Sequence, residues 1–118
     1  MNYTSIEQSK HLLELGLKAE TADMFWSQHN CYSIPWIWDR CKLIKTDIPC
    51  WSVGQLLELM PKIKGSKCPK LLKFIKNDKQ FYVVSYKRIS YTGFYKTPIE
   101  ACYETMCWLL QNNYIKTE

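Results

Sequence analysis

The segment from Thr97 to Asn113 constrains the fold more than any other part of this 118-residue chain. It opens with Thr97-Pro98-Ile99-Glu100, which combines an N-cap, a proline at the first helical position and a capping-box glutamate. Apolar residues then recur at helical spacing in two stripes: Ile99, Cys102, Tyr103, Met106, Leu109 and Leu110; and Ala101, Thr105 and Trp108. A helix with two such stripes needs two packing partners, so we expect it to touch a sheet and other helices.

Three shorter helices are expected before it. Thr4-Ser5-Ile6-Glu7 fits a capping box with Thr4 as the N-cap, and Gly16 marks the stop of that helix. A second helix is predicted over 19–26, where apolar residues recur three and four apart. Ser52-Val53-Gly54-Gln55 is another capping box, and Pro61 predicts where the third helix ends.

Three strands are expected between the last two helices, at 71–76, 80–88 and 91–96. These segments are rich in aromatic and β-branched residues, and the short links between them favour antiparallel neighbours. A weaker pattern predicts a strand at 40–45. The sequence therefore predicts one α+β domain over 1–118, in the order α-α-(irregular)-α-β-β-β-α, with a three-stranded antiparallel sheet packed by helices.

Compartment and cofactors follow from simple absences in the sequence. Glu7, Lys10 and Glu14 interrupt what would be the apolar part of a signal peptide, and no apolar run approaches the ~18 residues that span a bilayer. We expect a cytoplasmic protein without membrane insertion. The six cysteines form no C-x-x-C pair. They are expected to be thiols that mostly act as small buried side chains, and no metal or cofactor is predicted.

One catalytic hypothesis stays open although no nucleotide-binding, metalloprotease or hydrolase motif occurs. Cys50 lies just before a helix N-terminus, where the helix dipole favours a thiolate. His11 or His29 could serve as its base. The competing interpretation is that Cys50 is a packing residue, because it precedes Trp51, which is placed to form a hydrophobic staple with Leu56 around the N-cap Ser52.

Tryptophans crowd the middle of the chain. Trp26 and Trp51 adjoin predicted helices and are expected in the core. Trp36 and Trp38 flank Ile37 in an extended stretch, so a strand would place both tryptophans on one face. Either Ile37 or the tryptophan pair is then exposed, and an exposed pair would form a binding ledge.

A lysine run provides the other candidate surface. Seven lysines and a single acid, Asp78, lie between positions 62 and 79. The candidate binding residues within it are Lys67, Lys70, Lys73, Lys76 and Lys79. Such a run can hold nucleic acid or an acidic protein. The competing interpretation is a solvated loop and an edge strand whose lysines discourage aggregation.

Charge is distributed unevenly along the chain. The formal net charge of +5 divides into −3 over residues 1–39, +10 over 40–99 and −2 over 100–118. The acidic ends could meet the basic middle within the fold or between subunits, which leaves a homo-oligomer open.

Four segments together resemble a known family. They are 5–12 (Ser-Ile-Glu-Gln-Ser-Lys-His-Leu), 21–24 (Thr-Ala-Asp-Met), 48–52 (Ile-Pro-Cys-Trp-Ser) and 97–101 (Thr-Pro-Ile-Glu-Ala). The chain is similar to short bacterial proteins without an assigned activity, often found on prophage-like or mobile elements. The resemblance implies a bacterial cytosolic setting and a role in the interplay between element and host, but no catalytic residue.

Three functions are thus carried forward. The leading one is a small non-enzymatic module that contacts another protein through the tryptophan-rich loop around Trp36 and Trp38 or through a sheet edge. The alternative is a weak, sequence-independent nucleic-acid binder that uses the 62–79 lysines. A Cys50-dependent enzyme is the third.

Overall fold

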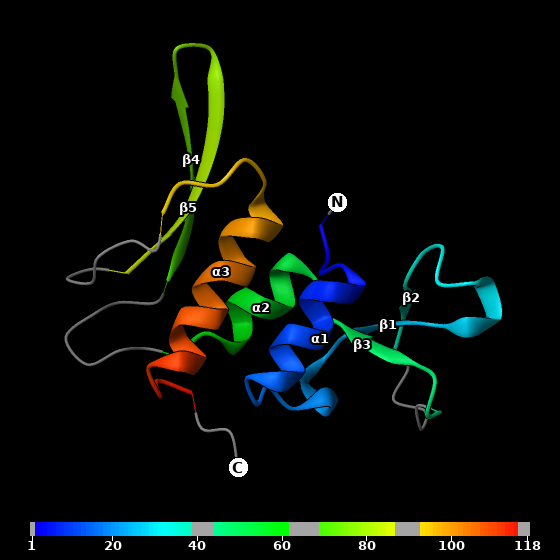
Figure 1. Ribbon diagram of the computed structural model, residues 1–118. Coiled ribbons are helices and arrows are strands. Elements are labelled where there is room, and N and C mark those ends of the chain that lie inside the picture. The colour runs from blue at the N-terminus through cyan, green and yellow to red at the C-terminus, as the bar shows by residue number, and fades with distance from the viewer. Residues whose placement is uncertain (1, 39–43, 62–68, 87–92, 116–118) are drawn as a thin grey trace.

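The computed structural model describes residues 2–38, 44–61, 69–86 and 93–115. Its helices are α1 (Ile6–Glu14), α2 (Val53–Leu59) and α3 (Pro98–Gln111). Its strands are β1 (Met24–Trp26), β2 (Trp36–Ile37), β3 (Ile48–Cys50), β4 (Lys70–Lys76) and β5 (Lys79–Ser85). The helices form the centre of the molecule, with β1–β3 on one side, while the β4–β5 hairpin projects past the helices on the other (Figure 1).

The predicted α+β class is confirmed, and β4 and β5 confirm the first two predicted strands and their antiparallel pairing, but the three-stranded sheet is built from other segments. The three-stranded sheet has the order β2-β1-β3; β2 and β3 come from the segment expected to be irregular, and β1 comes from the end of the helix predicted over 19–26. Both of its pairings are antiparallel, and Met24 lies opposite both Ile37 and Cys50. The hairpin region forms a separate two-stranded sheet, and its expected third strand is represented by an isolated bridge between Tyr82 and Tyr95. Part of that expected strand, and most of the one expected at 40–45, lies outside the described residues.

The helix predicted over 19–26 is also wrong. Only Ala19–Thr21 is helical, as one 3₁₀ turn, and β1 follows. Ala22 and Trp26 are both buried and lie four residues apart. That spacing places two side chains on one side of a helix, but it also places them on one face of an extended segment. Pairing with two other strands decides between the alternatives, and sequence spacing does not reveal such pairing.

The N-cap of α1 is Ser5 rather than Thr4. The Ser5 hydroxyl accepts from the Gln8 amide, and the Gln8 side chain accepts from the Ser5 amide, which completes a capping box one residue later than predicted. Thr4 is buried just before this cap and connects the start of α1 to the residue that follows β3, because its hydroxyl accepts a 3.1 Å hydrogen bond from the Trp51 amide. The two neighbouring hydroxyl side chains therefore have different roles: Ser5 caps the helix and Thr4 is buried.

The starts of α2 and α3 agree with the sequence. Ser52 caps α2 and Thr97 caps α3, each accepting from the amide three residues on. The helix α2 ends at Leu59, and Met60 is extended before Pro61 as expected. In α3 both predicted stripes contribute buried residues, and the helix contacts β5 as well as α1 and α2, as expected. The fully buried members of the core include Leu12, Trp51, Leu56, Met106 and Leu109.

Candidate functional site

The β4–β5 hairpin is built around a two-residue turn. Asn77 and Asp78 have φ values of 52° and 61°, the left-handed pair that a type I′ turn requires. This turn sets the register, in which Phe74 faces Phe81 and Lys76 faces Lys79. Because side chains alternate along a strand, all four of these residues share one face.

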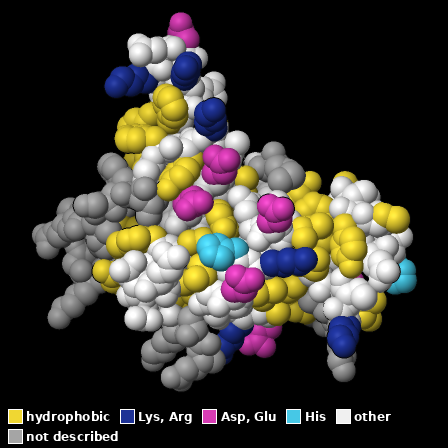
Figure 2. Space-filling model, in the orientation of Figure 1, with side chains coloured by type: hydrophobic (Ala, Val, Ile, Leu, Met, Phe, Trp, Pro, Cys, Tyr) yellow, Lys and Arg dark blue, Asp and Glu magenta, His cyan; other side chains and the backbone are white. Residues whose placement is uncertain are grey.

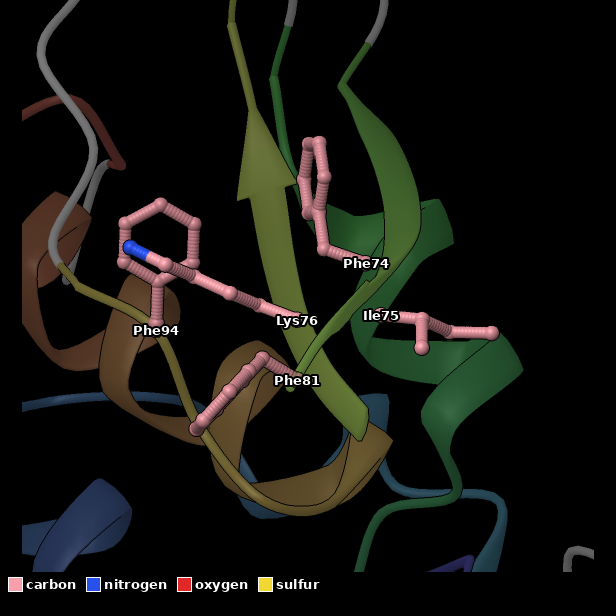
Figure 3. Close-up of a pocket in the computed structure, with 5 residues that line it drawn as sticks. All are labelled: Phe74, Ile75, Lys76, Phe81 and Phe94. Carbon is pink, nitrogen blue, oxygen red and sulfur yellow. The ribbon is translucent and has the colours of Figure 1, made fainter. Parts of the chain in front are cut away.

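Aromatic side chains wall a hollow on that face. Phe74, Phe81 and Phe94 surround it together with Lys76, and it encloses about 520 Å³. The Phe74 and Phe94 rings meet edge to face, with centroids 5.9 Å apart. In Figure 3 the Lys76 side chain extends toward Phe94, whereas Ile75 points to the opposite side of the hairpin. The hollow is therefore an apolar site with an ammonium group at its rim.

The position of Phe94 depends on a backbone bridge to β5. The Tyr82 amide donates to the Tyr95 carbonyl at 2.6 Å, and the Tyr95 amide donates to the Tyr82 carbonyl at 2.8 Å. Gly93 precedes this bridge with a φ of 152°, a conformation that side chains rarely adopt. The bridge brings Phe94 beside Phe74, twenty positions earlier in the chain.

These apolar side chains are exposed to an unusual degree. Ile75 is 69% exposed, Phe94 is 59% exposed and Phe74 is 41% exposed. Closer to the helices the same hairpin is covered, since Val83 and Val84 are buried. Within the hairpin, the exposed apolar side chains thus lie in its projecting half. Exposed apolar surface that gathers in one place is typical of an interaction site.

Lysines accompany this apolar surface. Lys70, Lys73, Lys76 and Lys79 are all exposed, as predicted for the lysine run, while Lys67 lies outside the described residues. Asp78 is the only acid in the hairpin. Figure 2 shows dark blue and yellow side chains together on the hairpin, whereas several acidic side chains gather over the helices.

The predicted tryptophan ledge does not form as a pair. Trp36 is 43% exposed and Ile37 is 81% exposed, but Trp38 is only partly buried and packs against the core. Trp36 meets Phe25 edge to face, with centroids 5.9 Å apart. Trp26 and Trp51 are buried, which confirms their predicted place in the core.

A second hollow lies between α1 and α3. It encloses about 410 Å³ and is lined by His11, Tyr103, Glu104 and Cys107 among others. The His11 Nδ1 atom lies 2.5 Å from the Tyr103 hydroxyl and 3.7 Å from the Cys107 sulfur. Burial raises the pKa of the Cys107 thiol to about 11, so the group stays protonated at neutral pH. Sequence reasoning did not single out this Cys–His–Tyr cluster, because its members come from two distant helices.

Cys50 has the surroundings of a packing residue. It is fully buried, and its thiol donates to the Thr4 carbonyl at 3.3 Å. Burial raises its pKa from 9.0 to about 11, the opposite of the shift that activates a nucleophile. Cys102 and Cys107 are also buried and Cys31 is exposed, in line with the expectation for most cysteines.

Within the described part of the chain, no cluster of three or more histidine, cysteine or acidic side chains is arranged to hold a metal ion. None of the helices described is both long and apolar enough to cross a bilayer.

Comparisons with known proteins give no match. This holds for protein-family models, for curated proteins and for solved structures. The function proposed for this chain therefore rests on the geometry of the hairpin and the helices.

Proposed function

We propose that the protein is a small non-enzymatic protein-interaction module whose contact surface is the β4–β5 hairpin. The observation that supports this most is the placement of Phe74 and Phe94, which are exposed around a hollow on the projecting hairpin, with Ile75 exposed on its other face. Aromatic side chains that frame a pocket are typical anchors of protein interfaces. We also propose that this module acts in the bacterial cytoplasm.

Selection from a random peptide library displayed on phage tests this function. The full chain serves as bait, beside the variants Phe74→Ser and Phe94→Ser. Ile37→Ser is the matched control, because it removes an exposed apolar side chain from the opposite side of the molecule. We expect peptides that bind the wild type and the control but lose binding to the hairpin variants. Peptides that bind all four proteins equally would contradict the proposal.

Nucleic-acid binding is the second candidate, and the exposed lysines beside aromatic rings favour it. Lysines attract phosphates without regard to sequence, and rings can stack on bases. Retention on heparin and on single-stranded DNA should then decrease steeply with salt, and replacing Lys73 and Lys76 by glutamine should abolish it. Free passage at about 50 mM salt would exclude this candidate.

A further inference from the structure

The geometry points to an acidic, extended segment of another protein that adds to the outer edge of β4 as a third strand. This inference rests on the proposed function and names the partner's chemistry. Within the described ranges β4 pairs with β5 alone, so one edge of its backbone has no strand beside it. A two-stranded ribbon is marginally stable in water, and a third strand would supply backbone hydrogen bonds and apolar cover.

The spacing of the lysines along β4 determines what such a strand must carry. The strand reads Lys-Leu-Leu-Lys-Phe-Ile-Lys over its seven residues. Lys70 and Lys76 lie on the face of the aromatic hollow, while Lys73 lies on the face of Ile75. Each lysine is separated from the next by two apolar residues, so both faces combine charge with apolar surface.

Cross-strand neighbours attract when their charges are opposite and when apolar residues lie side by side. The complement of β4 therefore has acids at its first, fourth and seventh positions, with a pair of apolar residues in each gap. This pattern is the same in both directions and fits a parallel or an antiparallel strand. The position beside Phe74 is the fifth in a parallel strand and the third in an antiparallel one, and it should be bulky because it lies on the face of the hollow.

A second copy of this chain does not fit the same edge. If two β4 strands paired antiparallel in register, Lys73 would lie against its own copy and Lys70 against Lys76. Like charges placed opposite each other destabilise a sheet, and lysines on an edge strand discourage self-pairing for this reason. The edge thus rejects copies of itself and accepts an acidic strand.

Nucleic acid is less well matched than an acidic strand. The Phe74 and Phe94 rings are inclined at 81° to each other, so they form the walls of a hollow rather than one stacking platform. The described hairpin also contains no arginine, the side chain that grips phosphate in a bidentate way. The lysines and apolar side chains of β4 are better complemented by a peptide strand in which carboxylates and apolar residues are interspersed.

Fluorescence anisotropy with labelled peptides and the full chain tests the inference. The probe is Glu-Val-Phe-Glu-Phe-Val-Glu, which has the length of β4 and places a phenylalanine beside Phe74 in either direction. Its controls are a scramble with the three acids adjacent, a version with lysine for every glutamate, a version N-methylated at alternate amides, and a thymidine oligonucleotide. We expect the probe to bind at least about fivefold more tightly than each control. Equal binding of the scramble, or preference for the oligonucleotide, would overturn the inference.

A charge exchange tests the register directly. Lys73→Glu should weaken binding of the probe by about fivefold, and a probe with lysine at its fourth position should recover that loss. Lys79→Glu is the matched control, because it makes the same charge change on β5, away from the β4 edge. If both variants weaken binding equally and the lysine-containing probe does not recover it, only the overall charge of the hairpin matters, and strand addition to β4 is refuted.

The two proposals fail in different ways. If the acidic probe does not bind but the phage selection yields peptides of another composition that depend on Phe74, the interaction module stands and its acidic partner is wrong. If the selection yields no peptide that depends on the hairpin and the acidic probe also fails, both are wrong.

Discussion

Asp23 holds the first turn of α2 through Ser52. Its carboxylate accepts a 2.9 Å hydrogen bond from the Ser52 amide and a 2.6 Å bond from the Ser52 hydroxyl. The same hydroxyl accepts from the Gln55 amide, which caps the helix. Asp23 directly precedes β1, so this pair fixes the small sheet to the helical core.

Replacing Asp23 by alanine should destabilise the protein by about 2 kcal/mol, because it leaves the Ser52 amide and hydroxyl without their charged acceptor. Urea denaturation measures the loss. Glu14→Ala is the control, since Glu14 is an exposed acid at the end of α1 and should cost less than about 0.5 kcal/mol. Equal stability of the two variants would show that the carboxylate does not support the N-cap.

Local signals predicted part of this arrangement and could not predict the rest. The caps at Ser52 and Thr97 involve neighbours three residues apart, so the sequence alone locates both helices. The strand β1 was missed because it exists only through pairing with β2 and β3, which come later in the chain. Its apolar spacing fits a helix as well as a strand.

The candidate site divides in the same way. The lysines are visible in the sequence, and so is a turn after residue 76. The structure limits this turn to Asn77 and Asp78, and that register places Phe74 opposite Phe81. The hollow needed Phe94, which arrives through the bridge at Tyr95. No short-range pattern connects these positions, and only the folded backbone brings them together.

Trp51 and Trp36 should respond very differently to truncation. Trp51 is fully buried, and its indole donates a 3.0 Å hydrogen bond to the Thr21 hydroxyl. Trp51→Ala should therefore lower the free energy of unfolding by about 4 kcal/mol, as truncation of other large core side chains does. Trp36→Ala, at a partly exposed position, should cost about 1 kcal/mol or less.

Acrylamide quenching checks the same difference without unfolding the protein. We expect Trp36 to supply the most accessible part of the fluorescence, so Trp36→Phe should leave a protein that is quenched more weakly. Unchanged quenching would contradict the exposure of this side chain.

Buried thiols should make the protein less stable in alkali. Burial raises the pKa of Cys50 to about 11 and that of Cys102 to about 12, from 9.0 for both. Between about pH 9 and pH 11 the unfolded chain loses protons that the folded chain keeps. The free energy of unfolding should therefore fall as the pH rises through this window, by roughly 1 kcal/mol per pH unit for each thiol.

Urea denaturation at about pH 8 and about pH 10 measures this fall. The contribution of the thiols is fully present at the lower pH, below the pKa of the unfolded chain, and is lost toward the higher pH. Cys102→Ala removes one titrating group, so its stability should decline less between the two conditions. An equal decline in the variant and the wild type would show that Cys102 titrates normally.

The turn of the hairpin should become more stable when Asp78 is replaced by glycine. Both turn residues have positive φ, and asparagine followed by glycine is the most favourable pair for a type I′ turn. We expect a gain of about 0.5 kcal/mol, because relief of the left-handed conformation outweighs the added freedom of the unfolded chain. Asp78→Asn removes the same charge but tolerates positive φ, so it should be nearly neutral. Asp78→Val should be destabilising by about 1–2 kcal/mol, because a β-branched residue resists this conformation.

Hydrogen exchange at the Phe74 and Phe81 amides is a suitable readout, since the projecting hairpin can open without the core. Protection should increase in the order valine, wild type, glycine. If all variants exchange alike, the turn does not limit hairpin opening. The glycine variant also connects stability with recognition. A better-ordered β4 edge loses less conformational entropy when a strand adds to it, so Asp78→Gly should bind the acidic probe more tightly than Asp78→Asn does.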